Sequence, residues 1–166
     1  MLRIGQGYDI HRLVEGRPLL LGGYRIPDAT LGLLGHSDAD ALVHAVIDAI
    51  LGALALGDIG RWFPDTDPQW RGAAGETLLR RVLADERVRP WRLVNLDSTV
   101  ITQTPRLAPH IDAVRDRLAQ LLDVPPAAVS VKAKTHERLD DIGAGLALEA
   151  HAVVLMERAT PSSSPR

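Results

Sequence analysis

The stretch HSDADALVHAVIDAILGALA, residues 36–55, decides the fold of this chain. Its apolar residues recur at helical spacing and wrap most of the circumference, which predicts a helix that is buried on nearly every side. Ser37 is the expected N-cap, and Asp40 follows three residues later as the acid of a capping box. The other elements of the domain must therefore cover this helix.

The flanking segments supply those elements. Alternating runs predict strands at residues 2–11, 91–103, 128–135 and 146–157. Amphipathic runs predict helices at residues 75–88 and 106–123, and Gly22-Gly23 marks a short hairpin. The pattern indicates a mixed sheet covered by helices, in an α+β or a two-layer α/β domain. We expect the α+β form, with a mixed four-stranded sheet and helices packed on one face in a ferredoxin-like two-layer arrangement.

Length and composition bound the function. We expect the 166 residues to form one domain over 1–158 and a disordered polar tail at 159–166. The formal charge of -2 is scattered, without the basic stripe that grips nucleic acid, so small-molecule partners are favoured. Cysteine is absent, so any metal must sit on His, Asp or Glu. Because neither a leader nor a membrane-length apolar run is recognisable, we expect a cytoplasmic protein that does not bind membranes.

The run GQGYDIHRL, residues 5–13, has the pattern of a strand but carries two strong ligand side chains. Asp9 and His11 are two residues apart, so they point to the same face of the strand, about 7 Å apart along the backbone. An oxygen donor and a nitrogen donor therefore converge on one spot.

The long helix carries a matching polar line. Asp40, His44 and Asp48 lie at i, i+4 and i+8 on an otherwise apolar cylinder. If this line faces Asp9 and His11, three protein ligands with an open fourth position form, as in a catalytic zinc site. Either aspartate of the helix can then orient His44 from behind. The alternative is a buried, hydrogen-bonded histidine beside an unrelated strand, and the spacing leaves both interpretations open.

Two further segments carry candidate binding residues. His36 and Ser37 precede the long helix, whose free N–H groups and dipole favour a phosphate, although plain capping by Ser37 explains them as well. Asp58, Asp65 and Asp67 lie in a Gly/Pro-rich loop, where they suit a sugar hydroxyl or a divalent ion. A solvated turn has the same composition.

Two strand ends add groups that suit phosphate. Lys134, Thr135 and Glu137 follow one strand, where a hydroxyl and a carboxylate favour phosphate and Mg²⁺, although an exposed charged turn has the same residues. Arg106 follows another strand as a possible phosphate partner. The three tryptophans are expected to be packing anchors.

Four runs together resemble one known family. They are RIGQGYDIHRL (3–13), GGYRIP (22–27), GLLGHSDADALVHAVIDAILGALALGDIGRWFPDTDP (32–68) and VSVKAKTHERL (129–139). In order and spacing they resemble the 2-C-methyl-D-erythritol 2,4-cyclodiphosphate synthases of the non-mevalonate isoprenoid pathway. The long central run is the most specific, because chance does not match a run of its length.

The resemblance implies two metal sites. Zinc, one ion per subunit, is implied on Asp9, His11 and His44. A second divalent ion, Mg²⁺ or Mn²⁺, is implied on Glu137 together with the substrate diphosphate. These ligand sets come from the resemblance and not from the spacing.

The resemblance also implies a substrate site. His36 and Thr135 match the residues that support the transition state. Residues 58–60 and 63–67 match the segments that bind the methylerythritol part, and residues 102–108 match the segment that binds the cytidine phosphate from a neighbouring subunit. The implied assembly is a homotrimer with active sites between subunits. The implied substrate-binding residues are Asp9, His11, His36, Ser37, Asp58, Ile59, Gly60, Phe63, Pro64, Asp65, Thr66, Asp67, Thr102, Gln103, Thr104, Pro105, Arg106, Leu107, Ala108, Lys134, Thr135, His136 and Glu137.

The implied reaction is an intramolecular phosphoryl transfer. The 2-phosphate of 4-diphosphocytidyl-2-C-methyl-D-erythritol 2-phosphate attacks the β-phosphorus, which closes 2-C-methyl-D-erythritol 2,4-cyclodiphosphate and expels CMP. No protein nucleophile is needed. The alternatives are a zinc-dependent phosphoesterase on a nucleotide-diphosphate substrate, which yields a linear product, and a trimeric binding module without activity.

Two places depart from the family's pattern. Gln6 stands where the family usually has His, at a peripheral position. The run DDIGAGLAL (140–148) carries Asp141, Ala144 and Leu146 where the family has an aromatic residue, an arginine and a glutamate. In the family these positions lie near the trimer axis, where the arginine can meet isoprenoid diphosphates. We expect this chain to lack that anion contact and to keep catalysis.

Overall fold

The computed structural model describes residues 1–27 and 29–159. The elements, with 3-10 helices labelled η, are β1 (Leu2–Glu15), β2 (Leu20–Leu21), β3 (Tyr24–Arg25), β4 (Leu31–Leu34), α1 (Ala41–Ala53), α2 (Ile59–Trp62), η1 (Pro68–Trp70), α3 (Gly75–Leu83), β5 (Trp91–Ile101), η2 (Ala108–His110), α4 (Ile111–Leu122), η3 (Pro126–Ala128), β6 (Val129–Lys134), α5 (Asp140–Gly143) and β7 (Ala147–Arg158). The predicted tail at 159–166 lies, apart from Ala159, outside the described residues.

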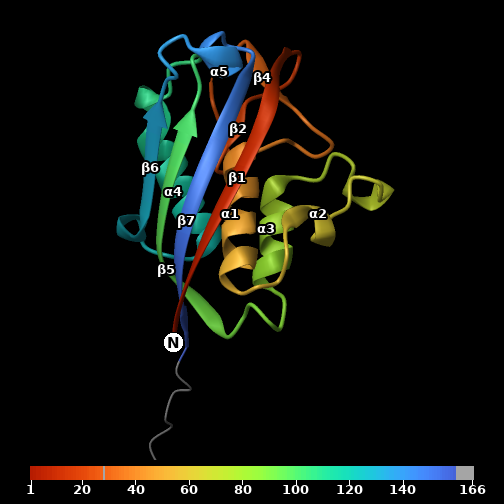
Figure 1. The fold of residues 1–166 in the computed structure, drawn as a ribbon, viewed down its shortest axis with the longest axis vertical. Helices are drawn as coiled ribbons and strands as arrows, with labels where there is room; N and C mark the ends of the chain where they lie inside the picture. The colour runs from red at the N-terminus through yellow and green to blue at the C-terminus, as the bar shows by residue number, and fades with distance from the viewer. Residues whose placement is uncertain (28, 160–166) are drawn as a thin grey trace, which may run out of the picture.

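The main sheet is mixed and has five strands in the order β4-β1-β7-β5-β6 (Figure 1). Only β5 and β6 run parallel among its neighbouring pairs in the described chain. The α+β class is confirmed, but the prediction of four strands is wrong because β4 adds an edge strand to β1. The run LGLL is too short to show a period, and Gly32 lets it lie close to a neighbouring loop, since a Cβ there would be 2.3 Å from the oxygen of Arg17.

Helix α1 packs on one face of the sheet against β1 and β7 (Figure 1). All of its residues except Asp48 and Gly52 are buried, which confirms the predicted central helix. The contact is tight because β1 carries glycines there: a Cβ on Gly5 or Gly7 would lie 1.9 Å from the oxygen of Ala49 or Ala45, respectively. Each fully buried Leu or Ile of this layer contributes about 1.5–3 kcal/mol to stability.

Asp40, and not Ser37, caps α1. The Asp40 side chain accepts a hydrogen bond from the amide of Val43 at 3.0 Å and further bonds from the amides of Gly22 (2.9 Å) and Gly23 (2.7 Å). The buried carboxylate therefore joins the helix start to the β2–β3 hairpin. The prediction of a Ser37 cap is wrong, and the position expected to attract a phosphate holds the protein's own carboxylate.

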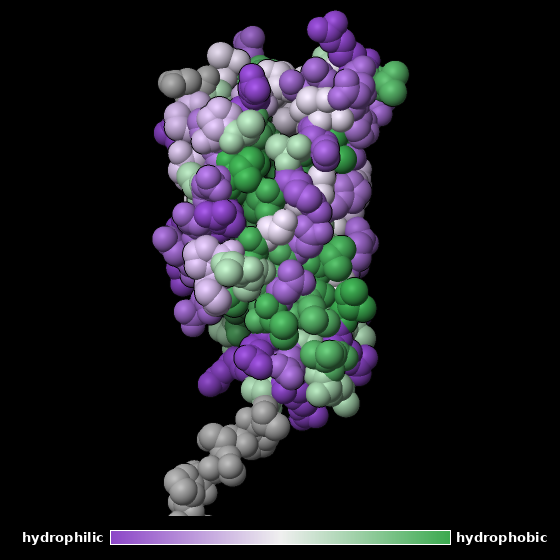
Figure 2. Space-filling model, turned by 90° about the vertical axis from the view of Figure 1, so that its left-hand side faces the viewer, coloured by the Kyte–Doolittle hydropathy of each residue, from purple (hydrophilic) through white to green (hydrophobic). Residues whose placement is uncertain are grey.

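The opposite face of β1 and β7 carries exposed apolar side chains. Ile4 is 71% exposed, and Ile10 and Val153 are 44% and 39% exposed. Figure 2 shows apolar residues gathered on one side of the molecule, mainly in its lower half. Apolar surface of this kind marks an interaction face.

The remaining predicted elements are present, with shifted ends. The helix predicted at 75–88 ends at Leu83 in α3, and the helix predicted at 106–123 divides into η2 and α4. None of the described helices has the length and apolarity needed to cross a bilayer.

Candidate metal centre

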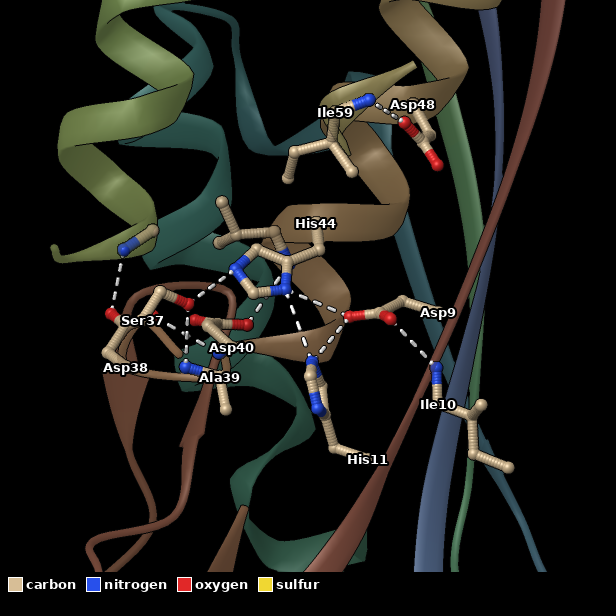
Figure 3. A network of polar contacts seen from close by, with 12 residues as sticks. Asp9, Ile10, His11, Ser37, Asp38, Ala39, Asp40, His44, Asp48 and Ile59 are labelled. Carbon is tan, nitrogen blue, oxygen red and sulfur yellow. Dashed lines mark hydrogen bonds and ion pairs between the residues drawn. The ribbon is translucent and has the colours of Figure 1, made fainter. Parts of the chain in front are cut away.

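Three ligand side chains converge where β1 crosses α1 (Figure 3). Asp9 and His11 come from β1, and His44 comes from α1. The Asp9 Oδ2 atom lies 3.0 Å from His11 Nε2 and 2.9 Å from His44 Nδ1, and the two ring nitrogens are 3.4 Å apart. The strand alternation and the helical spacing thus bring the predicted ligands together.

The outer nitrogen of each imidazole has its own partner. His11 Nδ1 lies 2.9 Å from the carbonyl oxygen of Leu34, and His44 Nε2 lies 3.2 Å from the hydroxyl oxygen of Ser37. If His11 donates to Leu34, its Nε2 keeps the lone pair that a metal needs. Such outer partners fix the rings of metal-ligating histidines. One carboxylate and two imidazoles fit a zinc ion with an open fourth position.

Burial and mutual attraction compete at this cluster. Burial alone would raise the pKa of Asp9, but its hydrogen bonds to His11 and His44 outweigh that cost and hold the pKa below the ordinary aspartate value. Burial would lower the pKa of His44, but the bond to Asp9 raises it above the ordinary histidine value. In the metal-free protein, a proton on His44 therefore supplies part of the positive charge that a bound metal ion would supply.

The ligands open into a hollow of about 210 Å³, here called the metal hollow. It is lined by Asp9, His11, His36, Ser37, His44, Asp48, Ile59, Gly60, Phe63, Asp65, Trp70 and Leu78. Of the residues predicted to bind the methylerythritol part, Ile59, Gly60, Phe63 and Asp65 lie on its wall. Leu78 and Trp70 also line the hollow, although the sequence does not predict them as site residues. A leucine on a helix and a tryptophan are ordinarily interpreted as packing residues.

Asp48 joins α1 to the segment predicted to bind the methylerythritol part, here called the substrate segment. Its Oδ1 accepts a hydrogen bond from the amide of Ile59 at 2.7 Å (Figure 3). Burial raises the pKa of this half-buried carboxyl, and the amide bond opposes that change. The hypothesis that Asp40 or Asp48 orients His44 is wrong, because Asp9 and Ser37 are its partners.

A separate hollow of about 360 Å³, here called the second hollow, lies at the ends of β5 and β6. It is lined by Thr102, Gln103, Pro105, Arg106, Leu107, Ala108, Ala133, Lys134 and Thr135. It shares no lining residue with the metal hollow, so His36 and Thr135 line different sites in the single chain. Most of the predicted cytidine-phosphate segment is thus gathered into one concave site.

Some predicted site residues lie in neither wall. Asp58 caps α2 through the amide of Arg61 at 2.9 Å, and Asp67 caps η1 through the amide of Gln69 at 3.0 Å. Glu137 is exposed and accepts a hydrogen bond from the Thr135 hydroxyl at 3.0 Å. Pro64, Thr66, Thr104 and His136 also belong to this group.

This geometry defines a class of protein. A carboxylate and two imidazoles share one point on a rigid strand–helix crossing, and their open side faces a hollow of small-molecule size. The class is that of α+β proteins with a mononuclear metal site open to a small-molecule substrate.

The chain belongs to the YgbB family, which matches residues 2–157. It is 58% identical over 159 residues to the 2-C-methyl-D-erythritol 2,4-cyclodiphosphate synthase of Chromobacterium violaceum, covering 96% of this chain and 100% of that protein. A solved 2C-methyl-D-erythritol-2,4-cyclodiphosphate synthase in a CDP-bound form is 44% identical, with a TM-score of 0.84, over 93% of this chain and all of that one. The bifunctional IspDF of Campylobacter jejuni is 38% identical, with a TM-score of 0.89, over 96% of this chain and 43% of that one.

Proposed function

We propose that this chain converts 4-diphosphocytidyl-2-C-methyl-D-erythritol 2-phosphate to 2-C-methyl-D-erythritol 2,4-cyclodiphosphate and CMP. The observation that carries the proposal is the convergence of Asp9, His11 and His44 beside a substrate-sized hollow. The family membership and the names of the relatives support the same reaction.

Zinc fits the site held by Asp9, His11 and His44. Bound there, the ion supplies a Lewis acid that polarises a phosphoryl oxygen. The protein's own part is to hold the three donor atoms within 3.4 Å of one another before substrate arrives. Leu34 and Ser37 hold the two rings in place from behind, so little reorganisation is needed.

The metal hollow binds the flexible, negatively charged substrate in a conformation in which its 2-phosphate lies near its diphosphate. Ile59, Gly60 and Asp65 are placed to hold the methylerythritol part, and His36 and Ser37 to contact the phosphate side. Closing a ring is an entropic task, for which well-oriented intramolecular reactions gain about 7–11 kcal/mol. This account uses no protein nucleophile, because the attacking oxygen belongs to the substrate.

The second hollow is the proposed site of the cytidine phosphate. Arg106 and Lys134 supply positive charge there, and Thr135 supplies a hydroxyl at the rim. Glu137, next to Thr135, is the proposed ligand of a second divalent ion, Mg²⁺ or Mn²⁺, on the diphosphate. The CDP-bound relative supports a cytidine nucleotide as part of the substrate.

A homotrimer with active sites between subunits completes the proposal. The two hollows share no lining residue within one chain, and we infer that a substrate that uses both bridges two copies. His36 and Thr135 would then act on the same phosphoryl transfer from different subunits. The exposed apolar face of β1 and β7 is the proposed contact between copies.

The test is ³¹P NMR of the purified protein with this substrate, Zn²⁺ and Mg²⁺. We expect the signals of CMP and of a cyclic diphosphate, which disappear in His44→Ala and persist in His110→Ala, whose histidine packs on Tyr24 and lines neither hollow. CMP with a linear phosphate would instead identify a phosphoesterase. No turnover by zinc-loaded protein would contradict the proposal.

A further inference from the structure

A third hollow, of about 460 Å³, opens where the C-terminal ends of α1 and α3 meet the segment from α2 to η1. We call it the arginine hollow because Arg61, Arg81 and Arg87 line it. It contains none of the metal ligands and none of the residues of the second hollow. It shares Phe63 and Trp70 with the metal hollow, but the synthase reaction proposed above makes no use of its arginines.

The charges of the arginine hollow are unbalanced. Asp85 is the single carboxylate in its described lining, and Arg87 already binds it, with Nε–Oδ1 and NH2–Oδ2 distances of 2.8 and 3.0 Å. The hydrogen bond to Arg87 lowers the pKa of Asp85, and the charge of Arg81 adds to this effect. Glu86 also acts on Arg87 through its charge. In the described chain, the ion pairs of arginines involve neither Arg61 nor Arg81.

One side of the hollow is held in a fixed geometry. The indole Nε1 of Trp62 donates to the carbonyl oxygen of Leu56 at 3.0 Å. The guanidinium carbon of Arg87 lies 4.8 Å from the centre of the Trp62 ring, a cation–π arrangement. Guanidinium groups bind phosphate oxygens through two parallel hydrogen bonds, and a prepositioned group gives up less entropy on binding.

We propose that the arginine hollow is a second anion site, which binds the phosphate group of a small phosphorylated molecule. Because guanidinium groups outnumber carboxylates in the lining, the ligand should be an anion. The volume of the arginine hollow admits a phosphate with a small group attached. Arg61 and Arg81, which form no ion pair with a carboxylate among the described residues, supply the main contacts.

The tryptophans distinguish this site from the metal hollow. Trp62 lines only the arginine hollow, whereas Trp70 lines both hollows, its ring 4.9 Å from that of Phe63 in the shared wall. Trp91 lies in neither. The chain has three tryptophans, so each indole N–H gives one assignable signal.

The experiment is a titration of the ¹⁵N-labelled, zinc-loaded protein with inorganic phosphate at constant ionic strength, in the presence of saturating CDP. CDP fills the proposed nucleotide site in the second hollow, and Trp62 does not line the metal hollow, so phosphate bound at either place is not what moves its signal. We expect the Trp62 indole signal to move along a saturable curve while the Trp91 signal stays fixed. The Trp62→Phe protein assigns the signal.

Substitutions identify the contacts. We expect Arg61→Gln and Arg81→Gln each to raise the half-saturating phosphate concentration about tenfold, because each removes a hydrogen bond between charged groups. Arg80→Gln is the matched control, since Arg80 is paired with Glu76 on the same helix, and it should bind as the parent does. A Trp62 signal that does not move with CDP present, or that moves equally in Arg81→Gln, would overturn the proposal.

Discussion

The metal hollow and the second hollow are built in different ways. In the metal hollow, half-buried side chains of one strand and a buried histidine of one helix lie at hydrogen-bond distance from one another, and the side chain of His44 is only 9% exposed. In the second hollow, Arg106, Lys134 and Thr135 are exposed at strand ends. The first site is organised by contacts within a single chain, whereas the second presents exposed side chains. The two should therefore respond differently to substitution.

The largest difference is expected from His44→Ala. Loss of an outer partner alone costs 10- to 100-fold in metal affinity, so loss of a ligand should lower zinc affinity by more than about a hundredfold. The binding of CMP should stay unchanged, because His44 lines the metal hollow and not the second hollow. Competition with a chelator measures the zinc affinity, and calorimetry measures the CMP affinity. His110→Ala is the control. An equal loss of CMP binding would show that the hollows are not independent.

Arg106→Ala should give the opposite pattern. It removes a charged hydrogen-bond donor from the second hollow, so the affinity for CMP should fall about tenfold while zinc affinity stays the same. Arg89→Ala, which removes an exposed arginine elsewhere, is the control. Unchanged CMP binding in Arg106→Ala would place the nucleotide somewhere else.

Asp48 tests how the metal hollow is held together. In Asp48→Ala the amide of Ile59 loses its acceptor, so the substrate segment is no longer fixed to α1. We expect KM to rise about tenfold with a smaller change in kcat, because a hydrogen bond to a charged group is lost while the metal ligands remain. Asp48→Asn keeps an acceptor oxygen and should recover most of the loss. If Asn and Ala behave alike, the bond to Ile59 is not what positions the segment.

The smallest effect concerns the metal-free protein. The raised pKa of His44 gives stability that is complete below about pH 6.5 and is lost as pH rises through its folded value. The lowered pKa of Asp9 gives stability that is present above about pH 3.9 and is lost as pH falls through its folded value. The pair should therefore stabilise the metal-free protein most between about pH 4 and 6.5.

Thermal unfolding of the chelator-treated protein across this range checks that window. His44→Ala, which removes one member of the pair, should flatten the dependence. A maximum above pH 7 in the metal-free parent would contradict the assigned directions.

Two local periods place the metal-centre residues, but they do not select the ligand set. Strand alternation places Asp9 and His11 on one face, and helical spacing places His44 on the polar line of α1. Which of these residues form a ligand set came from the family resemblance, because the spacing could not show that the strand faces the helix. The predicted N-cap, Ser37, was wrong because both serine and aspartate cap helices, so the sequence does not distinguish Ser37 from Asp40. Asp40 is favoured by its hydrogen bonds from the amides of Gly22 and Gly23, which lie in a distant hairpin.

The features that sequence reasoning missed depend on contacts between distant segments. The fifth strand, β4, is too short to carry a period and is defined by its pairing with β1. The bond from Asp48 to the amide of Ile59 requires the position of a loop, which no local pattern gives. The altered loop at 140–148 forms α5 at its start, and its loss of an anion contact stays a prediction.

The most direct test of the central claim, that one reaction site is shared between two chains, is complementation in mixed assemblies. His44→Ala removes the metal hollow and Thr135→Ala damages the second hollow, and each protein alone should be inactive. When the two are unfolded together and reassembled, some interfaces pair an intact metal hollow with an intact second hollow, so formation of CMP and cyclic diphosphate should return. Mixed assemblies that stay as inactive as the parent variants would show that each site lies within one chain and would contradict this account.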